Sequence, residues 1–284
     1  MTLAPTRRLL DEAVAARRGL GAFNVLHLET AEALVAAAEQ TGLPVVLQLS
    51  ENCVKFHGGL EPIARATLAV ADASSAQVAV HLDHAEDPEL ALRAIDLGFG
   101  SVMYDGAKLP FDENVATTRR VVARAAASGV LVEAELGEIG GKDGAHAPGV
   151  RTDPDEAVRF VTETGVGALA VAVGSSHAMT ERVAAIDLDL IARLHDAVPV
   201  PLVLHGSSGV ADDLIVAGIR SGLVKVNVST HLNAQFTGAI RAYLDAHPAA
   251  VDSRTYLAVG RDAVAREAAR LLELFGSAGK DPNG

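Results

Sequence analysis

The sequence predicts an α/β fold, a closed (β/α)8 barrel of the TIM-barrel type with an additional helical region near its C-terminal end. Eight short apolar segments alternate with helical patterns, and such alternation implies parallel strands joined by right-handed crossovers. Aromatic residues make up only 4% of the 284 residues, so Val, Leu, Ile and Ala must fill the core. Nothing in the chain resembles a glycine-rich dinucleotide-binding turn, which disfavours a doubly wound open sheet.

The expected strands are short apolar runs bounded by turn residues. In chain order they cover residues 21–25, 44–50, 77–83, 100–105, 130–137, 168–174, 202–205 and 224–228. Helical patterns cover 1–18, 28–40, 60–71, 111–128, 188–196, 212–220 and 254–275, and two more helices begin at the Asp-Pro pairs 87–88 and 153–154. No change in composition marks a second domain. We therefore expect residues 1–284 to form one domain, with a flexible tail at 277–284.

The overall charge limits the classes of partner. The 24 Lys and Arg residues against 36 Asp and Glu give a net charge of −12, which argues against binding to nucleic acid or to an anionic membrane. Cys53 is the single cysteine, so no internal disulfide can form. The chain lacks an apolar run of the roughly 20 residues that a bilayer span requires. A cytoplasmic protein with a reduced thiol is expected.

Three of the expected buried strands deliver a histidine to their carboxyl ends. His84 ends QVAVHLDH, His177 ends LAVAVGSSH, and His205 follows the run PLVL. The carboxyl ends of the strands in a parallel barrel meet at one mouth. Three imidazoles there are a ligand set for a catalytic zinc ion with an open fourth position. His81 lies deeper on the same strand as His84 and is expected to be structural.

Several carboxylates lie close to these histidines. Asp83 adjoins His84, so the two side chains are expected to point differently; Asp83 then either orients a ligand, acts as an acid or base, or caps the next helix. Asp105 and Glu135 stand at strand ends, where they could lie beside a metal or serve only in polar packing. Glu133 shares the face of Glu135 but lies deeper, which favours structural hydrogen bonding.

A candidate anion site follows the seventh and eighth strands. The turn Gly206-Ser207-Ser208-Gly209 precedes a helix, and the eighth strand closes with Asn227, Ser229 and Thr230. Backbone N–H groups and hydroxyls at such turns bind oxyanions, and these two loops are the usual phosphate site of a TIM barrel.

These motifs resemble one known family. HLDH at 81–84, VEAELG at 132–137, LAVAVGSSH at 169–177, VLHGSSG at 203–209 and VKVNVST at 224–230 are similar to the class II, zinc-dependent ketose-bisphosphate aldolases. The resemblance extends over nearly the whole chain. It implies an aldehyde-lyase that reversibly cleaves a ketose 1,6-bisphosphate, by default fructose 1,6-bisphosphate, to dihydroxyacetone phosphate and glyceraldehyde 3-phosphate. Tagatose 1,6-bisphosphate or another phosphorylated ketose, such as a deoxy-keto acid phosphate, is the alternative substrate.

The resemblance also implies residue roles. His84, His177 and His205 match the zinc ligands, and Asp83 matches the acid or base at the C4 hydroxyl. Glu135 matches an alternative carboxylate on the metal side, and Asp105 a polar neighbour of the metal. The positions that match substrate contacts are Asn24, Ser50, Gly206, Ser208, Asn227, Ser229, Thr230 and Arg254, the last of them at the far phosphate. One zinc ion per subunit, a monovalent cation (Na⁺ or K⁺) and a homodimer or homotetramer complete the expectation. Lys225 is not expected to form a Schiff base, because the zinc replaces that chemistry.

Three positions depart from the usual family pattern. Ala178 stands where the family has glycine, His231 where an acidic residue is common, and the loop 140–149 lacks the glutamate that moves the C3 proton. Asp143 is the nearest acidic residue and is expected to take that role, with His146 as the second candidate. The missing glutamate also motivates a reading outside catalysis, a paralogue that only binds metal or sugar phosphate. A metal-dependent hydrolase on the same fold is a third reading.

Overall fold

The first strand pairs with both the second and the last, which closes the sheet into a barrel. The structure, a computed structural model, describes residues 3–136, 151–176 and 181–279. β1 (Leu20–Asn24) lies between β2 (Val45–Ser50) and β8 (Leu223–Val228), and all neighbouring strands are parallel. The strands between them are β3 (Val78–Ala85), β4 (Ser101–Tyr104), β5 (Leu131–Leu136), β6 (Ala168–Val171) and β7 (Leu202–Leu204). The predicted (β/α)8 barrel is confirmed.

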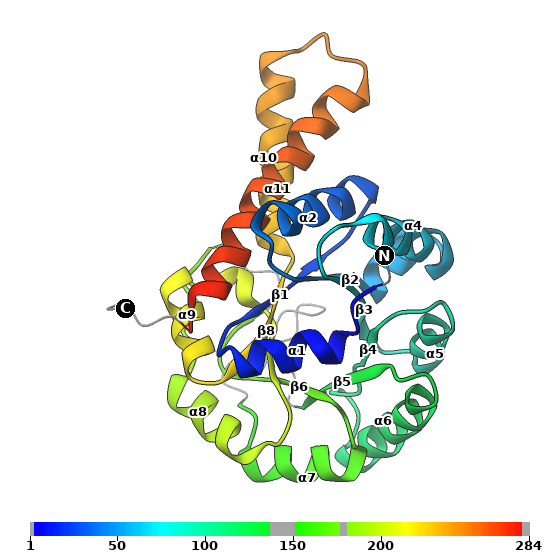
Figure 1. The fold of residues 1–284 in the computed structure, drawn as a ribbon, viewed down its shortest axis with the longest axis vertical. Coiled ribbons are helices and arrows are strands. Elements are labelled where there is room, and N and C mark those ends of the chain that lie inside the picture. Colours follow the sequence, from blue (N-terminus) through cyan, green and yellow to red (C-terminus); the bar gives the residue numbers. More distant parts are fainter. Residues whose placement is uncertain (1–2, 137–150, 177–180, 280–284) are drawn as a thin grey trace.

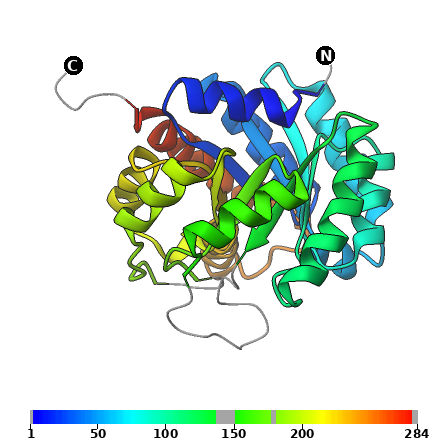
Figure 2. The same cartoon turned by 90° about the horizontal axis from the view of Figure 1, so that it is seen from below.

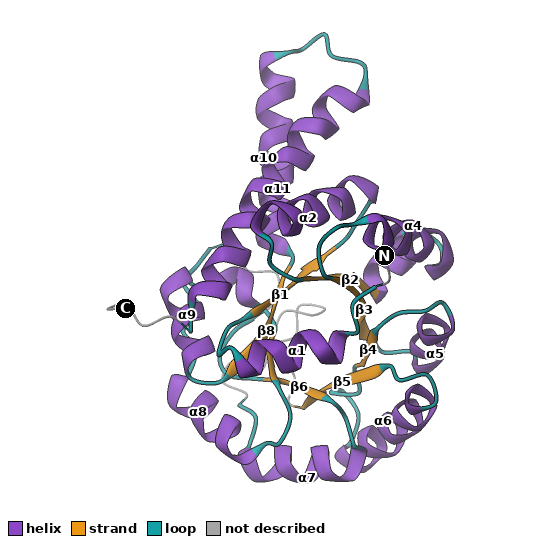
Figure 3. Ribbon diagram, viewed as in Figure 1, coloured by secondary structure: helices purple, strands orange, loops and turns teal. Residues whose placement is uncertain are grey.

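Helices surround the strands (Figures 1 and 3). They are α1 (Thr6–Ala15), α2 (Leu28–Thr41), α3 (Glu51–Phe56), α4 (Leu60–Ala73), α5 (Pro88–Asp96), α6 (Phe111–Ala126), α7 (Pro154–Thr164), α8 (Leu188–Ala197), α9 (Asp212–Arg220), α10 (Thr230–Ala246) and α11 (Ser253–Ser277), with a short 3-10 turn at Ser207–Gly209. Both Asp-Pro signals hold, because Asp87 and Asp153 accept hydrogen bonds from the first backbone N–H groups of α5 and α7. Two helices, α3 and α10, were not expected from the sequence.

Two apolar layers hold the barrel together. The larger layer packs between the outer faces of the strands and the surrounding helices. The smaller one joins Leu9 and Leu10 of α1 to side chains inside the barrel, among them Val46, Met103 and Val203. α1 lies across the amino end of the barrel (Figures 1 and 2). The polar side chains inside the barrel therefore lie toward the opposite, carboxyl end.

The C-terminal helices form an arm. α10 and α11 pack against each other, and the loop that joins them stands at the far end of the arm in Figure 1. The other half of α11 returns to the barrel and packs on α2, where Leu272 and Phe275 are buried. The predicted C-terminal helical region is thus real, but it is longer than expected. Residues 277–279 still belong to its described end, and 280–284 lie outside the described residues.

The apolar plug, formed by the buried residues Leu9 and Leu10 of α1 at the amino end of the barrel, makes a testable contribution to stability. Leu10 is 1% exposed, so Leu10→Ala should lower the free energy of unfolding by about 2–5 kcal/mol in urea denaturation. Val14, on the same helix, is 45% exposed, and Val14→Ala should change it by less than about 0.5 kcal/mol. Equal effects of the two substitutions would contradict the role given to α1.

Candidate functional site

Polar side chains line the carboxyl half of the barrel in two levels. Because side chains alternate along a strand, residues two apart face the same side. Glu133 and Lys225 make up part of the deeper level, and Glu135 and Asn227 follow them two residues later at the mouth. His205, directly after β7, joins the mouth group and is completely buried. The same pattern therefore recurs on several strands. Along each of them, the inward-facing side chains change from apolar to polar toward the mouth.

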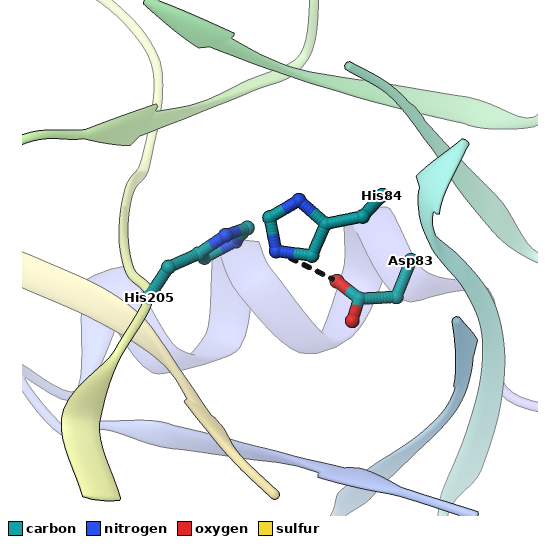
Figure 4. A group of neighbouring side chains, drawn as sticks. All are labelled: Asp83, His84 and His205. Carbon is teal, nitrogen blue, oxygen red and sulfur yellow. Dashed lines mark ion pairs between the residues drawn. The ribbon is translucent and has the colours of Figure 1, made fainter. Parts of the chain in front are cut away.

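An irregularity in β3 brings two consecutive residues to the mouth. The register between β3 and β4 shifts between Leu82 and Ala85, and His84 has a left-handed backbone with φ +49°. This conformation is rare for a residue other than glycine and is concentrated at functional sites. It brings His84 Nε2 to 3.9 Å from Asp83 Oδ1 (Figure 4). The expectation that these two side chains point differently is therefore wrong, because regular alternation does not hold at this position.

The two described histidines converge. The rings of His84 and His205 meet edge to face, with 4.5 Å between their centroids, and both extend toward the middle of the mouth (Figure 4). Ligand atoms of Asp83, His84 and His205 lie within 4.8 Å of one another, as do those of His84, Asp105 and Glu135. Imidazole nitrogen and carboxylate oxygen are donors that suit zinc and similar transition metals. The chemistry of this donor set fits a metal ion. His177 lies outside the described residues.

Each histidine has a carboxylate on one ring nitrogen. Asp105 Oδ2 lies 2.8 Å from His84 Nδ1, and Glu133 Oε1 lies 3.1 Å from His205 Nε2. An ionised carboxylate only accepts, so the ring nitrogen that it faces carries the proton. In the neutral form of each ring, the other nitrogen, His84 Nε2 or His205 Nδ1, is then the one that could bind a metal ion. Glu135 Oε2 stands 3.4 Å from His205 Nδ1, on this second side.

The charges in the mouth influence one another strongly. Burial acts to raise the pKa of Asp83, but the nearby His84, His205 and Lys225 outweigh it and lower that pKa to about 2. Burial acts to lower the pKa of His205, but its bonds to Glu133 and Glu135 outweigh it and raise that pKa to about 9. Asp83 is therefore ionised at neutral pH and can accept a proton. A metal ion would have to displace a proton from His205.

Three amides surround the Asp83 carboxylate. Asn227 Nδ2 lies 3.3 Å from its Oδ1, and Asn24 Nδ2 lies 3.4 Å from its Oδ2. Gln48 donates to Asn24 Oδ1 at 2.8 Å and lies 3.5 Å from Asp83 Oδ2. Gln48 was missed in the sequence; its signal is that it shares the face of Ser50 on β2. Ser50 pairs in register with Asp83 and accepts a hydrogen bond from Cys53 N at the start of α3.

The turn at 206–209 is held from two sides. Ser207 Oγ donates to the backbone oxygen of Asn227, and Ser208 Oγ accepts from His231 N at 3.1 Å, in the first turn of α10. Gly206 has φ +65°, and a Cβ there would lie 2.6 Å from the carbonyl carbon of Ser176. Only glycine therefore fits this position without a backbone shift. Ser229 and Thr230 start α10 beside the turn.

Arg254 lies apart from these residues. It is the second residue of α11, beside the loop at the far end of the arm. Its side chain is 88% exposed and bonds to Asp252 of the same helix start, with 2.6 Å between Nη2 and Oδ2. The structure therefore brings Asn24, Ser50, Asp83, Asn227 and the two histidines together, but not Arg254. Asp143 and His146 lie outside the described residues.

Two potential nucleophiles, Lys225 and Cys53, are not available for reaction: the lysine is in an ion pair and the cysteine is a protonated thiol. Lys225 Nζ lies 2.8 Å from Glu133 Oε2, and both side chains are 1% exposed. Cys53 is buried, and burial raises the pKa of its thiol to about 11, so little thiolate exists at neutral pH. Neither group is placed for covalent chemistry. In the part of the chain that the structure describes, no helix has the length and apolar character to cross a membrane.

Comparisons with known proteins agree on one family. The family model described as "Fructose-bisphosphate aldolase class-II" matches residues 4–280. The fructose-bisphosphate aldolase of Giardia intestinalis is 38% identical over 98% of this chain and 94% of its own. The 6-phospho-5-dehydro-2-deoxy-D-gluconate aldolase of Bacillus licheniformis is 35% identical over 99% and 97%. Among solved structures, the YdjI aldolase from Escherichia coli K12 superposes with a TM-score of 0.84 at 31% identity, covering 98% of this chain and 99% of that one.

Proposed function

The chain belongs to the class-II fructose-bisphosphate aldolase family, and we propose that it reversibly cleaves fructose 1,6-bisphosphate to dihydroxyacetone phosphate and glyceraldehyde 3-phosphate. It is a carbon–carbon lyase of a metal-dependent family that acts on sugar phosphates. The observation that carries the proposal is the ionised Asp83 directly beside the two converging histidines, His84 and His205. A protein that only binds metal or sugar phosphate would not need this acid or base.

The resident metal in this proposal is one zinc ion per subunit. His84 would hold it through Nε2 and His205 through Nδ1, the nitrogens that Asp105 and Glu133 leave available. His177 is the third ligand in the proposal, and Glu135 a carboxylate on the metal side. When bound, the zinc supplies a Lewis acid that stabilises the negative charge left on the triose fragment as C3–C4 breaks.

Asp83 is the proposed base in the cleavage direction. It takes the proton of the C4 hydroxyl, the C4–O bond becomes a carbonyl, and the C3–C4 electron pair stays with the triose fragment. Asn24 and Asn227 hold the carboxylate in place and can also contact the substrate. The fragment must then gain a proton at C3. We propose that Asp143 makes that transfer, because it is the acidic residue nearest in the sequence to the position where the family has a glutamate.

In this proposal, the phosphate of the dihydroxyacetone-phosphate half binds at the turn 206–209 and the start of α10. Gly206, Ser208, Ser229 and Thr230 offer backbone N–H groups and hydroxyls beside the start of α10, where the helix dipole favours an anion. A sodium or potassium ion next to this turn would offset part of the phosphate charge. Ser50, in register with Asp83, is proposed to contact the sugar chain.

The far phosphate requires a second copy of the chain. Arg254 is the proposed cation for it, but this residue lies on the arm and not at the mouth of its own barrel. An arm that reaches across to a neighbouring barrel would bring the arginine to that site. We therefore propose a homodimer, or a homotetramer built from such dimers, in which each mouth receives Arg254 of its neighbour.

Two further features belong to the proposal. We propose that residues 1–284 form one domain, because the larger apolar cluster of the described residues extends from Phe23 on β1 to Ala278 just beyond α11. A cytoplasmic location suits the unpaired Cys53 and a phosphorylated substrate.

A second substrate class is favoured by one observation. The Bacillus licheniformis relative is nearly as similar as the Giardia one, and its name specifies a deoxy-keto acid phosphate. Such a substrate shares the phosphorylated ketose end but places a carboxylate where fructose 1,6-bisphosphate has its second phosphate. The kcat/KM values of the two substrates, measured by release of triose phosphate, decide between them. Tagatose 1,6-bisphosphate is not favoured, because neither the family model nor these relatives carry its name.

Activity should depend on the metal. Chelation followed by dialysis should abolish triose-phosphate release in a coupled assay, and one equivalent of zinc per subunit should restore it. His84→Ala, His177→Ala and His205→Ala should each abolish it, because two remaining imidazoles hold zinc poorly. The control is His195→Ala, a change of an exposed residue in the last turn of α8. Full activity in protein that elemental analysis shows to be free of metal would refute the mechanism.

Removal of the Asp83 carboxylate should affect turnover and not metal content. Asp83→Ala should reduce kcat by roughly 10²–10⁴-fold, the usual contribution of a placed acid or base. Zinc stoichiometry should remain near one per subunit. If the variant instead loses zinc and turns over normally once zinc is restored, Asp83 only orients a ligand.

Arg254 should act from the partner subunit on the far phosphate. Arg254→Ala should raise KM for fructose 1,6-bisphosphate much more than for a ketose with one phosphate. Coexpression of Arg254→Ala chains with His205→Ala chains should restore activity, since each mixed dimer then holds one complete site, about a quarter of all sites. Absence of restoration, with mixed dimers demonstrated, would mean that the arginine does not act between subunits.

Asp143 should control the C3 proton. Asp143→Asn should slow the exchange of the dihydroxyacetone-phosphate C3 proton with solvent, followed by NMR, while zinc content and substrate affinity stay near normal. His146→Ala is the matched comparison within the same loop. An unchanged exchange rate in Asp143→Asn together with a reduced rate in His146→Ala would transfer the role to the histidine.

A further inference from the structure

A level of buried charge lies directly beneath the mouth. Glu133 of β5 and Lys225 of β8 are each 1% exposed, and His81 of β3 is completely buried beside them. None of these three side chains is proposed above to contact the substrate or to ligate the metal. Apolar side chains adjoin them, because Met103 of β4 is in register with Glu133 and Val203 of β7 is in register with Lys225.

Charges in such a place require an explanation. Removal of a carboxylate and an ammonium group from water costs free energy that their mutual attraction only partly recovers, and an apolar pair of similar size is often as stable. Glu133 and Lys225 therefore contribute no more to the free energy of unfolding than an apolar pair of the same volume would. A requirement of the site above them is the better explanation.

The two oxygens of Glu133 have separate partners. Oε2 lies 2.8 Å from Lys225 Nζ and 4.0 Å from His81 Nε2, whereas Oε1 lies 3.1 Å from Nε2 of His205. His81 is itself fixed, because its Nδ1 lies 2.8 Å from Ser101 Oγ. With Oε2 tied to Lys225, the carboxylate plane is set, and Oε1 is held under the His205 ring.

This contact selects one ring nitrogen of His205. A carboxylate in an ion pair accepts hydrogen bonds only, so the proton of a neutral His205 stays on Nε2 and the lone pair on Nδ1. Nδ1 is the nitrogen on the side of Glu135, 3.4 Å from its Oε2. His84 is arranged in the opposite way, with Asp105 on its Nδ1. The two rings therefore offer different nitrogens to one centre.

We propose that Glu133 and Lys225 form a positioning pair that fixes the tautomer and ring orientation of His205, so that the metal is bound through Nδ1. This inference rests on the proposed function, because it takes His205 as a metal ligand. Glu133 acts through His205, and Lys225 acts through Glu133. Partners of this kind on the far nitrogen of a ligating histidine change metal affinity by about 10–100-fold.

The test separates positioning from stability. In Glu133→Met combined with Lys225→Met, the buried charges and the acceptor disappear while the volume is kept. Glu133→Gln combined with Lys225→Met also removes the charges, but an amide oxygen remains for His205. Zinc dissociation constants come from competition with a chelator, and the thermal stability of the metal-free proteins is measured in parallel. The ¹⁵N NMR signals of His205 in the zinc-loaded proteins report which nitrogen is bound.

The doubly apolar variant should keep or increase its thermal stability and yet bind zinc about 10–100-fold more weakly. The Gln-Met variant should bind zinc within about threefold of wild type and retain the Nδ1 signature. Ser101→Ala is the control: it breaks a bond in the same buried level without touching His205, and it should leave zinc affinity unchanged. Zinc affinity of the doubly apolar variant within about threefold of wild type would overturn the inference.

A further variant tests the inference if the doubly apolar protein does not fold. Glu133→Asp keeps a charge for Lys225 but withdraws the oxygen from His205 by one methylene, and its zinc affinity should fall by a similar factor. Normal zinc affinity in Glu133→Asp would also overturn the inference. If wild-type protein bound no zinc, the metal centre of the proposed function would be wrong, and this inference would be wrong with it. Tight binding by wild type with undiminished binding by the variants overturns this inference alone.

Discussion

The left-handed backbone at His84 is the constraint on which the site depends. In a regular strand, Asp83 and His84 would face opposite sides of the sheet, one into the barrel and the other toward the helices. The register shift against β4 and the φ of +49° turn both toward the mouth. A base and a metal ligand can then act on adjacent atoms of one substrate. The surrounding barrel must hold this strained residue in place, and the complete burial of β3 and of the neighbouring β4 provides that support.

The interior of the barrel is graded from apolar to polar along its axis. Apolar side chains of α1 and of the strands fill the amino end; above them lies the Glu133–Lys225 pair, and then the two described histidines and Asp83. Each level restrains the next one, because Lys225 fixes Glu133 and Glu133 faces His205. The carboxylates and amides near the mouth are similarly linked through Asn24, Gln48 and Asn227. The site is therefore organised before any substrate arrives.

Most of the fold could be predicted from the sequence, because eight short apolar runs separated by helical patterns leave few alternatives. The convergence of His84, His205 and Asp83 at one mouth also followed from strand ends in a parallel barrel. The direction of Asp83 relative to His84 did not, because a bulge depends on the backbone of β4 and has no marker in the sequence. Gln48 was missed because its one signal, the face that it shares with Ser50, does not distinguish a site residue from a structural buried amide. The distance of Arg254 from the mouth depends on α10, whose mostly exposed faces lack the periodic apolar stripe of a core helix.

The apolar plug formed by α1 has a consequence for the entry of substrate and the release of products. Because Leu9 and Leu10 of α1 are buried at the amino end of the barrel, its polar interior can be reached only from the mouth. Substrate, both three-carbon products, protons and the metal ion must all share that opening. Entry of substrate and release of both products therefore compete for the same side of the barrel.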